Sequence, residues 1–476
     1  MNINNIIKEA YNKWENKEYV YEKINNEYKS ITYGEFIKRT TDLAKKLIDL
    51  GLKDKRIIIF SKNSTDYMIS DLAVLAYVGI SVNINVQTSE YELREILKTM
   101  EIDAVLYDNN KKDIIDIIKN EYKNIKFICM QEVINHSENC ILDFEFEDKD
   151  INKCSKIVFS SGTTSNPKAI MLSLKNIFAG WKSLNRRTPL SETDVVYLFL
   201  PLHHTYGNIY NFIYSLLSGF SIYLCSGIEN MSSELKEVNP TIFCAVPLIY
   251  KKLYFENIAN LEETFGNRIK YLFCGGSKFD IEIRKCYKQN GLPMLEAYAL
   301  TETASSLSIE YPGDNDYESA GTIFEDIDVK IINEDTNGIG DIVVKGDNVF
   351  LGYANNEKLT SKVFTEDGYF ITGDYGYIKG NKLYVKGRKD TVIVGDNGEN
   401  IYPKEIENKL KSLCSNIIRV KSFLKDNNKL VCNIYLTEDS NVNLNEVIEE
   451  YNRQVVKKDK IYEFYEIKDS KIDLKQ

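Results

Sequence analysis

In the N-terminal part of the chain, segments with the apolar spacing of a helix alternate with short apolar segments typical of a strand. Helical spacing occurs in residues 33–50, 64–77 and 89–100, and short apolar runs typical of buried strands occur in residues 56–60, 79–85 and 104–107. The alternation predicts α/β architecture with a largely parallel sheet.

The later part of the chain contains strands that end in turns. Residues 239–247 predict a strand entered through a proline turn, and residues 271–277 predict a strand that ends in two glycines, where a flat ligand can lie against bare backbone. A small β-rich subdomain is predicted from short strands and tight turns at 340–346, 352–353 and 370–376.

Length and charge limit the possible classes of protein. The chain has 476 residues, more than one hydrophobic core normally supports, so two or more domains are expected. Hydrophobic residues make up 43% and charged residues 27%, a balance typical of soluble globular proteins. The net charge of −10, without any basic block, argues against a nucleic-acid partner.

Neither export nor a membrane span is expected. The start of the chain lacks the basic residues and apolar core of a signal peptide. The longest apolar run, residues 209–225, is interrupted by polar residues and is too short to span a membrane, so a buried helix followed by a strand is predicted there. The nine cysteines lack the spacing of a metal or disulfide framework, so we expect thiols in a reducing cytoplasm.

A hydroxyl-rich turn within residues 157–172 is the strongest candidate for a binding site. Its hydroxyls, glycine and lysine can approach and neutralise an anion, and few ligands besides a polyphosphate need so many donors. The GxxxxGK[ST] phosphate loop is excluded, because Pro167 and Ala169 do not fit that pattern. A Ser/Thr-rich hairpin turn is the alternative. The candidate anion-binding residues are Ser160, Ser161, Gly162, Thr163, Thr164 and Lys168.

Four segments resemble, in order and approximate spacing, the motifs of the adenylate-forming superfamily, which comprises acyl-CoA synthetases, stand-alone adenylation domains and firefly-type luciferases. The hydroxyl-rich turn is similar to the family's phosphate loop, Leu200–Gly207 to its Pro-Leu-x-His-x-x-Gly motif, and Leu295–Thr303 to its Gly-Tyr-Gly-x-Thr-Glu motif. Gly387–Glu407 resembles the hinge motif in the longer form of the fatty acyl-CoA synthetase branch. The resemblance covers essentially the whole chain.

The resemblance implies a fold and a division of the chain. The class is α/β, with a large N-terminal domain of layered mixed sheets flanked by helices, a small β-barrel-like subdomain, and a small mobile α+β C-terminal domain. Residues 1–386 would form the N-terminal AMP-binding adenylation domain and residues 387–476 the C-terminal domain, with the hinge near Asp390.

The resemblance also assigns residues to ATP and Mg²⁺. Tyr298 would stack on adenine, Thr301 would donate to the α-phosphate, and Glu302 would hold Mg²⁺ as a hard oxygen ligand. Asp374 would accept hydrogen bonds from both ribose hydroxyls, although an aspartate that caps a turn is the simpler interpretation of this residue alone. The other implied ATP-binding residues, besides the hydroxyl-rich turn, are Gly275, Gly276, Ser277 and Arg388.

The acid pocket follows from the same motifs. His204 would line the pocket near the reacting carboxylate, with His203 beside it, and Ala297 and Ala299 would narrow the pocket because they replace family glycines. The alternative for the histidines is that they only satisfy the hydrogen bonds of a turn. The implied catalytic residues are Lys471, Thr163, His204 and Glu302.

The C-terminal motif is the least similar. Lys471 matches the lysine of a Ser-Gly-Lys-Ile element that neutralises charge during adenylation, but Ser470 replaces the glycine, and a solvated terminal lysine is the competing interpretation. Gly398 would lie where the pantetheine arm of the thiol enters. Acidic and basic residues balance from Arg388 onward, a weak indication that this part meets an anionic partner, either CoA or an acyl- or peptidyl-carrier protein.

The implied reaction has two steps. A carboxylate attacks the α-phosphorus of ATP to form an acyl-adenylate, and the thiol of CoA or of phosphopantetheine then accepts the acyl group. In the family that the chain resembles, members that activate amino acids carry an aspartate near this motif to hold the amine, and residues 202–208 contain no aspartate. The resemblance therefore disfavours an α-amino acid, and the aromatic and aliphatic residues of 200–249 suit an aliphatic or aromatic acid.

Other functions remain open at this point. The chain could load a carrier protein instead of CoA. It could also be a non-catalytic nucleotide-binding regulatory relative, which the loss of several family glycines suggests; the replacements are Ser165, Ala169, Ala297 and Ala299. Nothing in the sequence favours a luciferase-type oxidation.

Overall fold

The computed structural model describes residues 2–134, 140, 142–160, 168–258, 260–389, 393–394, 400–425, 429–437, 440, 442–455 and 459–468. The chain forms two compact units, and each unit combines two separate segments of sequence. The first unit comprises Met1–Val329 and Val344–Phe370, and the second comprises Lys330–Val343 and Ile371–Gln476.

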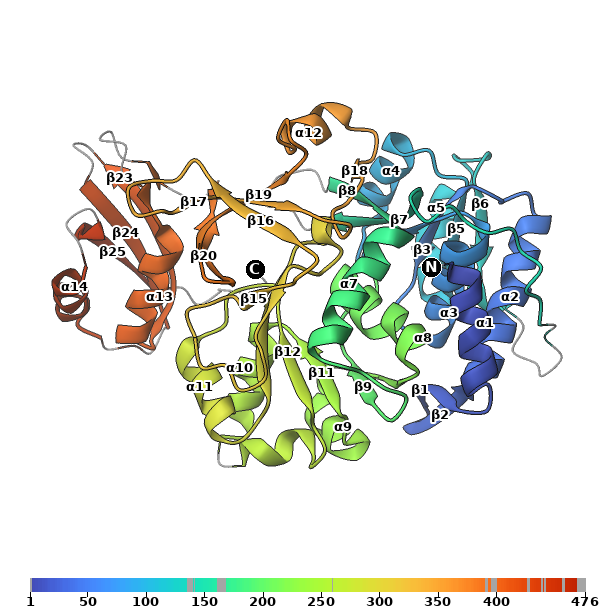
Figure 1. Cartoon of the computed structure of the whole chain (residues 1–476), viewed down its shortest axis with the longest axis horizontal. Helices are drawn as coiled ribbons and strands as arrows, with labels where there is room; N and C mark the ends of the chain where they lie inside the picture. Colours follow the sequence, from blue (N-terminus) through green and yellow to red (C-terminus); the bar gives the residue numbers. More distant parts are fainter. Residues whose placement is uncertain are drawn as a thin grey trace. The chain divides into compact units, whose positions relative to one another are not determined.

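The first unit contains a seven-stranded sheet. Its strands are β3 Arg56–Phe60, β4 Ile80–Asn83, β5 Ala104–Tyr107, β6 Lys126–Cys129, β7 Cys154–Ser160, β8 Lys168–Ser173 and β18 Gly352–Tyr353 (Figure 1). The order is β18-β8-β7-β4-β3-β5-β6; the strands from β7 to β6 run parallel, and the β8 pairings are antiparallel. Apolar runs such as Ile57–Phe60 are fully buried because helices cover both faces of a parallel sheet.

A second sheet of the first unit carries most of the other strands. These are β1 Glu18–Ile24, β2 Glu27–Thr32, β9 Val195–Leu198, β10 Ser221–Leu224, β11 Ile242–Ala245, β12 Tyr271–Cys274, β13 Met294–Tyr298, β14 Ser308–Ile309 and β15 Thr322–Ile323. Within this unit the order is β2-β1-β10-β9-β11-β12-β13-β14-β15, and the strands from β1 to β13 are parallel. Ligands of open α/β sheets bind at the carboxyl ends of parallel strands, so these ends are where a site is expected.

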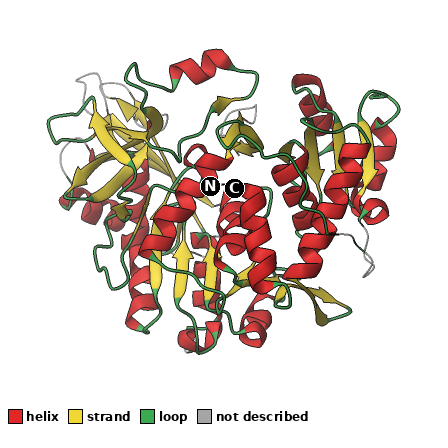
Figure 2. Cartoon of the chain, turned by 45° about the vertical axis from the view of Figure 1, so that its right-hand side comes forward, coloured by secondary structure: helices red, strands yellow, loops and turns green. Residues whose placement is uncertain are grey.

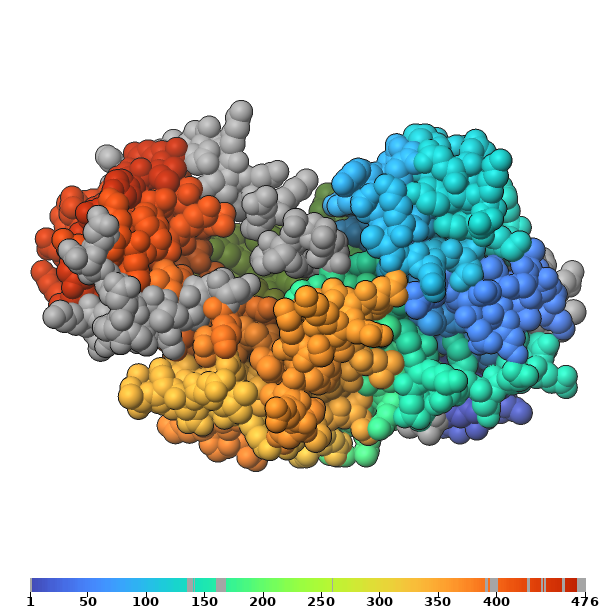
Figure 3. Space-filling model, turned by 90° about the horizontal axis from the view of Figure 1, so that it is seen from above, coloured from blue at the N-terminus to red at the C-terminus, as the bar shows by residue number. Residues whose placement is uncertain are grey.

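Helices lie beside the strands of both sheets (Figure 2). They are α1 Ile3–Trp14, α2 Tyr33–Asp49, α3 Thr65–Ala73, α4 Glu90–Thr99, α5 Lys112–Ile118, α6 Met130–Val133, α7 Leu174–Arg187, α8 Tyr214–Ser218, α9 Met231–Val238, α10 Pro247–Glu256, α11 Ile281–Gln289 and α12 Glu357–Lys362. Capping boxes begin α2 and α4, which explains why these helices start where they do. Figure 3 shows residues from the N-terminal part of the chain, coloured blue to turquoise, as one continuous region of this unit's surface.

Shorter helical segments complete the first unit. Two π-helical segments, η1 Val74–Val78 and η3 Tyr206–Ile213, follow α3 and precede α8. The 3₁₀ turns are η2 Asn109–Lys111, η4 Leu261–Phe265 and η5 Thr301–Thr303. Single π-helical turns within helices are frequent at functional sites. Residues in or beside η1 and η3 are therefore candidates for a functional site.

The second unit has an antiparallel part and a C-terminal α+β part. Strands β16 Asp328–Ile332, β17 Gly340–Lys345, β19 Phe370–Lys379 and β20 Lys382–Arg388 are neighbours in this order. The C-terminal part contains β21 Ile393–Val394, β22 Asn400–Ile401, α13 Pro403–Leu413, β23 Ile417–Lys425, β24 Lys429–Leu436, α14 Leu444–Arg453 and β25 Ile461–Lys468. Its helices and the β23-β24-β25 sheet enclose a hydrophobic cluster of their own, which includes Ile406, Leu410 and Ile434.

Most predicted elements and the α/β fold class are confirmed. The helices predicted at 33–50 and 89–100 correspond to α2 and α4, and the apolar run 209–225 forms η3, α8 and then β10. In the described part of the chain, no helix is long and apolar enough to cross a membrane. The domain division at residue 386 stays a prediction.

One strand differs from the prediction. Residues 352–353 were expected in a β-rich subdomain with their sequence neighbours, but β18 pairs with β8 at the edge of the seven-stranded sheet. The pairing joins Gly352 to Met171 and Tyr353 to Ile170, a long-range contact that local sequence patterns do not encode.

Candidate active site

The hydroxyl-rich turn connects two paired strands of the seven-stranded sheet. Strand β7 runs antiparallel to β8, and Ser160 pairs with Lys168 at the end of the ladder. The turn therefore leaves the carboxyl end of β7, and the ladder holds its two ends together. The predicted loop residues that lie outside the described part of the chain are Ser161, Gly162, Thr163 and Thr164.

Lys168, Tyr353 and Glu302 form a short chain of contacts. The Nζ atom of Lys168 lies 5.4 Å from the centre of the Tyr353 ring, a distance at which a cation is attracted to an aromatic face. The Tyr353 hydroxyl donates a hydrogen bond of 3.0 Å to Oε1 of Glu302. The fold thus brings the predicted phosphate-binding lysine close to the predicted Mg²⁺ ligand, although they are far apart in sequence.

The backbone directly after Glu302 is strained. Ala304 and Ser305 have φ values of 46° and 60°, a left-handed conformation that costs a non-glycine residue about 1–2 kcal/mol. The Ser305 hydroxyl donates a hydrogen bond of 2.7 Å to the Thr205 hydroxyl. This contact links the Glu302 segment to the residue that follows His204. Strain of this kind is concentrated at functional sites.

The two histidines lie in the turn that follows β9. Their ring centres are 4.3 Å apart. Burial lowers the pKa of both, and that of His203 falls to about 3 because His204 adds a smaller effect. Both rings are therefore neutral near pH 7. His203 is 8% exposed, and its Nε2 has no hydrogen-bond partner among the described residues, whereas His204 is half-buried.

Gly275, the first of the two glycines after β12, packs closely against Ala297 and Tyr206. A Cβ on Gly275 would lie 3.4 Å from the carbonyl oxygen of Ala297 and 3.6 Å from the Tyr206 ring. Gly276 has a φ of +90°, which favours glycine. Strands β12 and β13 are parallel neighbours, so the glycine pair and Tyr298 leave the sheet at the same edge. Tyr298 is half-buried.

The other residues of the first unit that were predicted to line the site lie next to the glycine pair, Tyr298 or Glu302 in the sequence. Ser277 is exposed directly after the glycine pair, and Thr301 is half-buried in η5. Ala169, Ala297 and Ala299 are not among the residues with positive φ, so these replacements of family glycines cause no backbone strain. Both alanines beside Tyr298 are half-buried.

In the second unit, Asp374 and Arg388 are cross-strand partners on β19 and β20. Nη1 of Arg388 lies 3.4 Å from Oδ1 of Asp374. The aspartate is buried, whereas half of the arginine side chain is exposed. Gly373 has a φ of +77°, and a Cβ there would lie 3.4 Å from Nη2 of Arg388. The turn at Gly373 therefore leaves room for the guanidinium beside the carboxylate.

Three predicted residues lie outside the described part of the chain: Asp390, Gly398 and Lys471. The hinge, the thiol entry and the charge-neutralising lysine therefore remain predictions.

Sequence reasoning missed the residues that connect the site. Tyr353 was predicted only as part of a short strand, and nothing in the neighbouring sequence indicated its contacts with Lys168 and Glu302. Thr205 and Ser305 are 100 residues apart, so no sequence pattern could have paired them.

Residues 7–354 match the family described as AMP-binding enzyme, and the chain belongs to this family. It is similar to the 2-succinylbenzoate–CoA ligase of Staphylococcus epidermidis, with 25% identity over 436 residues that cover 90% of this chain and 87% of the relative.

Two solved structures share the fold. The ATP-bound MatB from Rhodopseudomonas palustris has a TM-score of 0.86 and 22% identity, covering 98% of this chain and 95% of that chain. The o-succinylbenzoate CoA synthetase MenE from Bacillus subtilis, in complex with the acyl-adenylate intermediate OSB-AMP, has a TM-score of 0.82 and 22% identity, covering 97% and 94%.

Proposed function

We propose that the protein is an ATP-dependent acid–thiol ligase that forms an acyl-adenylate and transfers the acyl group to CoA. The observation that carries the proposal is the chain of contacts from Lys168 through Tyr353 to Glu302, beside the end of the hydroxyl-rich turn. Membership of the AMP-binding enzyme family and the similarity to a CoA ligase support it.

The first step brings a carboxylate anion onto a polyanionic triphosphate, so positive charge and positioning must supply most of the catalysis. We assign Lys168, the hydroxyl-rich turn and Lys471 to this task. Glu302 fits Mg²⁺, because a carboxylate is a hard oxygen ligand and bound Mg²⁺ would shield the phosphate charge. Mg²⁺ usually keeps several waters and binds substrate phosphates besides one or two carboxylates, so a single glutamate suits it.

Each unit contains residues that we assign to the nucleoside. Asp374 can accept hydrogen bonds from the two ribose hydroxyls, with Arg388 beside it. Tyr298 would stack on adenine, and the backbone of Gly275, Gly276 and Ser277 would face its edge.

The acid would meet a neutral histidine. A neutral His204 ring can orient the carboxylate through a hydrogen bond, whereas an imidazolium would hold it as an ion pair and weaken it as a nucleophile. Ala297 and Ala299 would narrow the pocket, so a small acid without an α-amino group is the proposed substrate class.

CoA is the proposed thiol, and the phosphopantetheine of a carrier protein is the second candidate. The second step requires a lysine to withdraw so that the thiol can reach the acyl-adenylate, which is the role proposed for the hinge near Asp390 and for the entry at Gly398. A reducing compartment such as the cytoplasm is proposed, because the nine cysteines lack the spacing of a disulfide framework.

Acid-dependent exchange of pyrophosphate into ATP, measured over a panel of carboxylic acids, tests the proposal. We expect exchange with a small set of non-amino acids, followed by thioester formation with CoA. Lys471→Ala and Glu302→Gln should lower the exchange rate by about 100-fold or more. Lys175→Ala is the matched control, because Lys175 makes a surface ion pair with Asp347.

The outcome separates the alternatives. Thioester formation with a carrier protein but not with CoA would favour carrier loading. ATP binding without pyrophosphate exchange for any acid would contradict the ligase and favour a non-catalytic nucleotide-binding role.

A further inference from the structure

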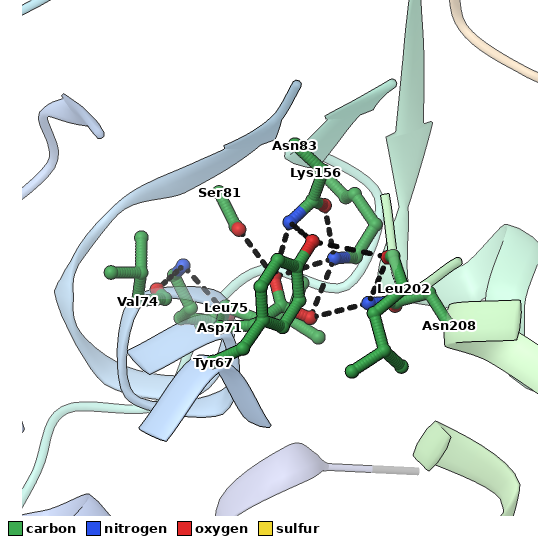
Figure 4. A network of polar contacts seen from close by, with 10 residues as sticks. Tyr67, Asp71, Val74, Leu75, Ser81, Asn83, Lys156, Leu202 and Asn208 are labelled. Atoms are coloured by element: carbon green, nitrogen blue, oxygen red, sulfur yellow. Dashed lines mark hydrogen bonds and ion pairs between the residues drawn. The ribbon is translucent and has the colours of Figure 1, made fainter. Parts of the chain in front are cut away.

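A fully buried ion pair joins strand β7, which leads into the hydroxyl-rich turn, to helix α3. Nζ of Lys156, on β7, lies 2.7 and 2.9 Å from the two carboxylate oxygens of Asp71, on α3, and neither side chain is exposed (Figure 4). The same ammonium donates a hydrogen bond of 2.6 Å to Oδ1 of Asn83 on β4. The ammonium group of Lys156 therefore links three elements of the first unit, namely β7, α3 and β4.

All the donors of Lys156 and both oxygens of Asp71 are used. The ammonium makes three contacts, and the carboxylate also accepts from Ser81, Asn83 and Asn208. Burial alone would raise the pKa of Asp71, but the charge of Lys156 and the hydrogen bonds from Lys156, Ser81 and Asn208 together lower it. Burial also lowers the pKa of Lys156, and the charge of Asp71 opposes that effect. The contacts hold the two side chains in one geometry.

The network reaches the histidine segment through two side chains. The Tyr67 hydroxyl accepts from Asn83 and donates a hydrogen bond of 3.1 Å to the carbonyl of Leu202 (Figure 4). Nδ2 of Asn208, in η3, bridges Asp71 and the same carbonyl at 2.8 and 3.0 Å. The backbone N–H of Asn208 also donates to the carbonyl of His204.

The network reaches the phosphate segment along a strand. Lys156 lies on β7, which ends at Ser160, where the hydroxyl-rich turn begins. One buried charge pair thus holds the strand that enters this turn and the loop that carries His203 and His204.

Stability alone does not explain such a pair. Buried ion pairs contribute little net stability relative to apolar side chains of similar volume, because desolvation offsets their attraction. They do fix the geometry of the elements that they join. Geometry matters here because attack of a carboxylate on a phosphorus requires the two reactants to be aligned, and misplacement by 1 Å can cost about 100-fold in rate.

We propose that Lys156, Asp71 and Tyr67 are positioning residues, which set the acid-binding histidine loop against the strand that enters the phosphate-binding turn. The proposal rests on the acid–thiol ligase function proposed above. All three side chains are buried, so they would act through the segments that they hold and not on the substrates directly.

Two buried tyrosines provide a matched test. Tyr67→Phe removes the hydroxyl that holds Leu202, whereas Tyr33→Phe removes a hydroxyl that is equally buried and donates to the carbonyls of Ser215 and Phe220. Both variants should lose similar thermal stability. We expect only Tyr67→Phe to lower kcat for pyrophosphate exchange, by about tenfold, with the KM for ATP nearly unchanged.

The ion pair is tested with a charge-free double variant, because removal of one partner alone can unfold the protein. Lys156→Met combined with Asp71→Leu removes both charges but takes partners from Ser81, Asn83 and Asn208, so we expect it to fold with a lowered unfolding temperature. It should lose at least as much kcat as Tyr67→Phe. A folded double variant with wild-type kcat and KM would overturn the proposal, as would equal kcat losses in the two tyrosine variants.

Histidine NMR gives a readout that does not depend on activity. The chain has three histidines, so their ring signals are few. In Tyr67→Phe, the low pKa of His203, about 3 in the wild type, should rise as the loop loosens, and in Tyr33→Phe it should not. If the wild type shows no exchange with any acid, the ligase function fails, and unchanged histidine signals in Tyr67→Phe would then overturn the positioning role separately.

Discussion

At the level of single residues, the ribose-binding proposal depends on one carboxylate. Asp374→Asn keeps the shape of the side chain but removes the charge beside Arg388. We expect the KM for ATP to rise about tenfold, because a hydrogen bond to a charged group contributes about 1.5–3 kcal/mol. Steady-state kinetics at saturating acid would measure this.

Asp341→Asn is the control for that variant. Asp341 is buried and pairs with Lys389 in the same unit, at 3.0 Å, much as Asp374 pairs with Arg388. A similar rise in KM for both variants would show that the effect comes from a loosened sheet and not from lost ribose contacts.

The buried His203 predicts a pH dependence of stability. Its folded pKa is about 3, below the ordinary 6.5, so the unfolded chain takes up a proton first as the pH falls. The stabilisation is complete above pH 6.5 and is lost as the pH approaches 3. Between pH 7 and pH 5 the loss is about 2 kcal/mol from this residue. Denaturant unfolding of wild type and His203→Gln should show a shallower acid dependence in the variant.

The chemistry of the site residues could be predicted from the sequence, but most of their partners could not. Hydroxyls, a lysine and a glutamate at family spacing were sufficient to nominate Lys168 and Glu302. Tyr353, which joins them, comes from a strand whose position depends on tertiary pairing. Lys156 is a lone charge in an apolar strand and so signals a buried partner, yet only the fold identifies Asp71.

At the level of elements, the turn after η5 stores strain. Ala304 has a φ of 46° although it carries a Cβ. Ala304→Gly should raise the free energy of unfolding by up to about 1 kcal/mol, because relief of the strain exceeds the added entropy of the unfolded chain. Thermal unfolding checks this. A decrease in stability would mean that packing of the methyl group, which is fully buried, outweighs the strain.

Local elements were predictable because their causes are local. Helical periodicity and a capping residue define α2 and α4, and a run of isoleucines defines β3. The π-helical segment η3 was not predicted, because its geometry depends on buried contacts such as the Asn208 bridge to Asp71.

At the level of the whole molecule, the C-terminal part has its own core. Leu410 is fully buried in a cluster drawn only from residues 401–461, whereas Leu272 belongs to a cluster of the first unit. Leu410→Ala should destabilise its part by about 2–5 kcal/mol and leave the other transition unchanged in calorimetry, and Leu272→Ala should do the reverse. A single transition that shifts equally in both variants would show that the two parts unfold together.

Strand β18 pairs with β8 although it follows β8 by about 180 residues in the sequence, and this order matters during synthesis on the ribosome. Strand β8 is synthesised long before residues 352–353. During translation, the edge of β8 that later pairs with β18 therefore has unpaired backbone N–H and C=O groups. The nascent chain therefore presents this edge for pairing with other chains until residues 352–353 have been synthesised, after the segment 330–343 that belongs to the second unit.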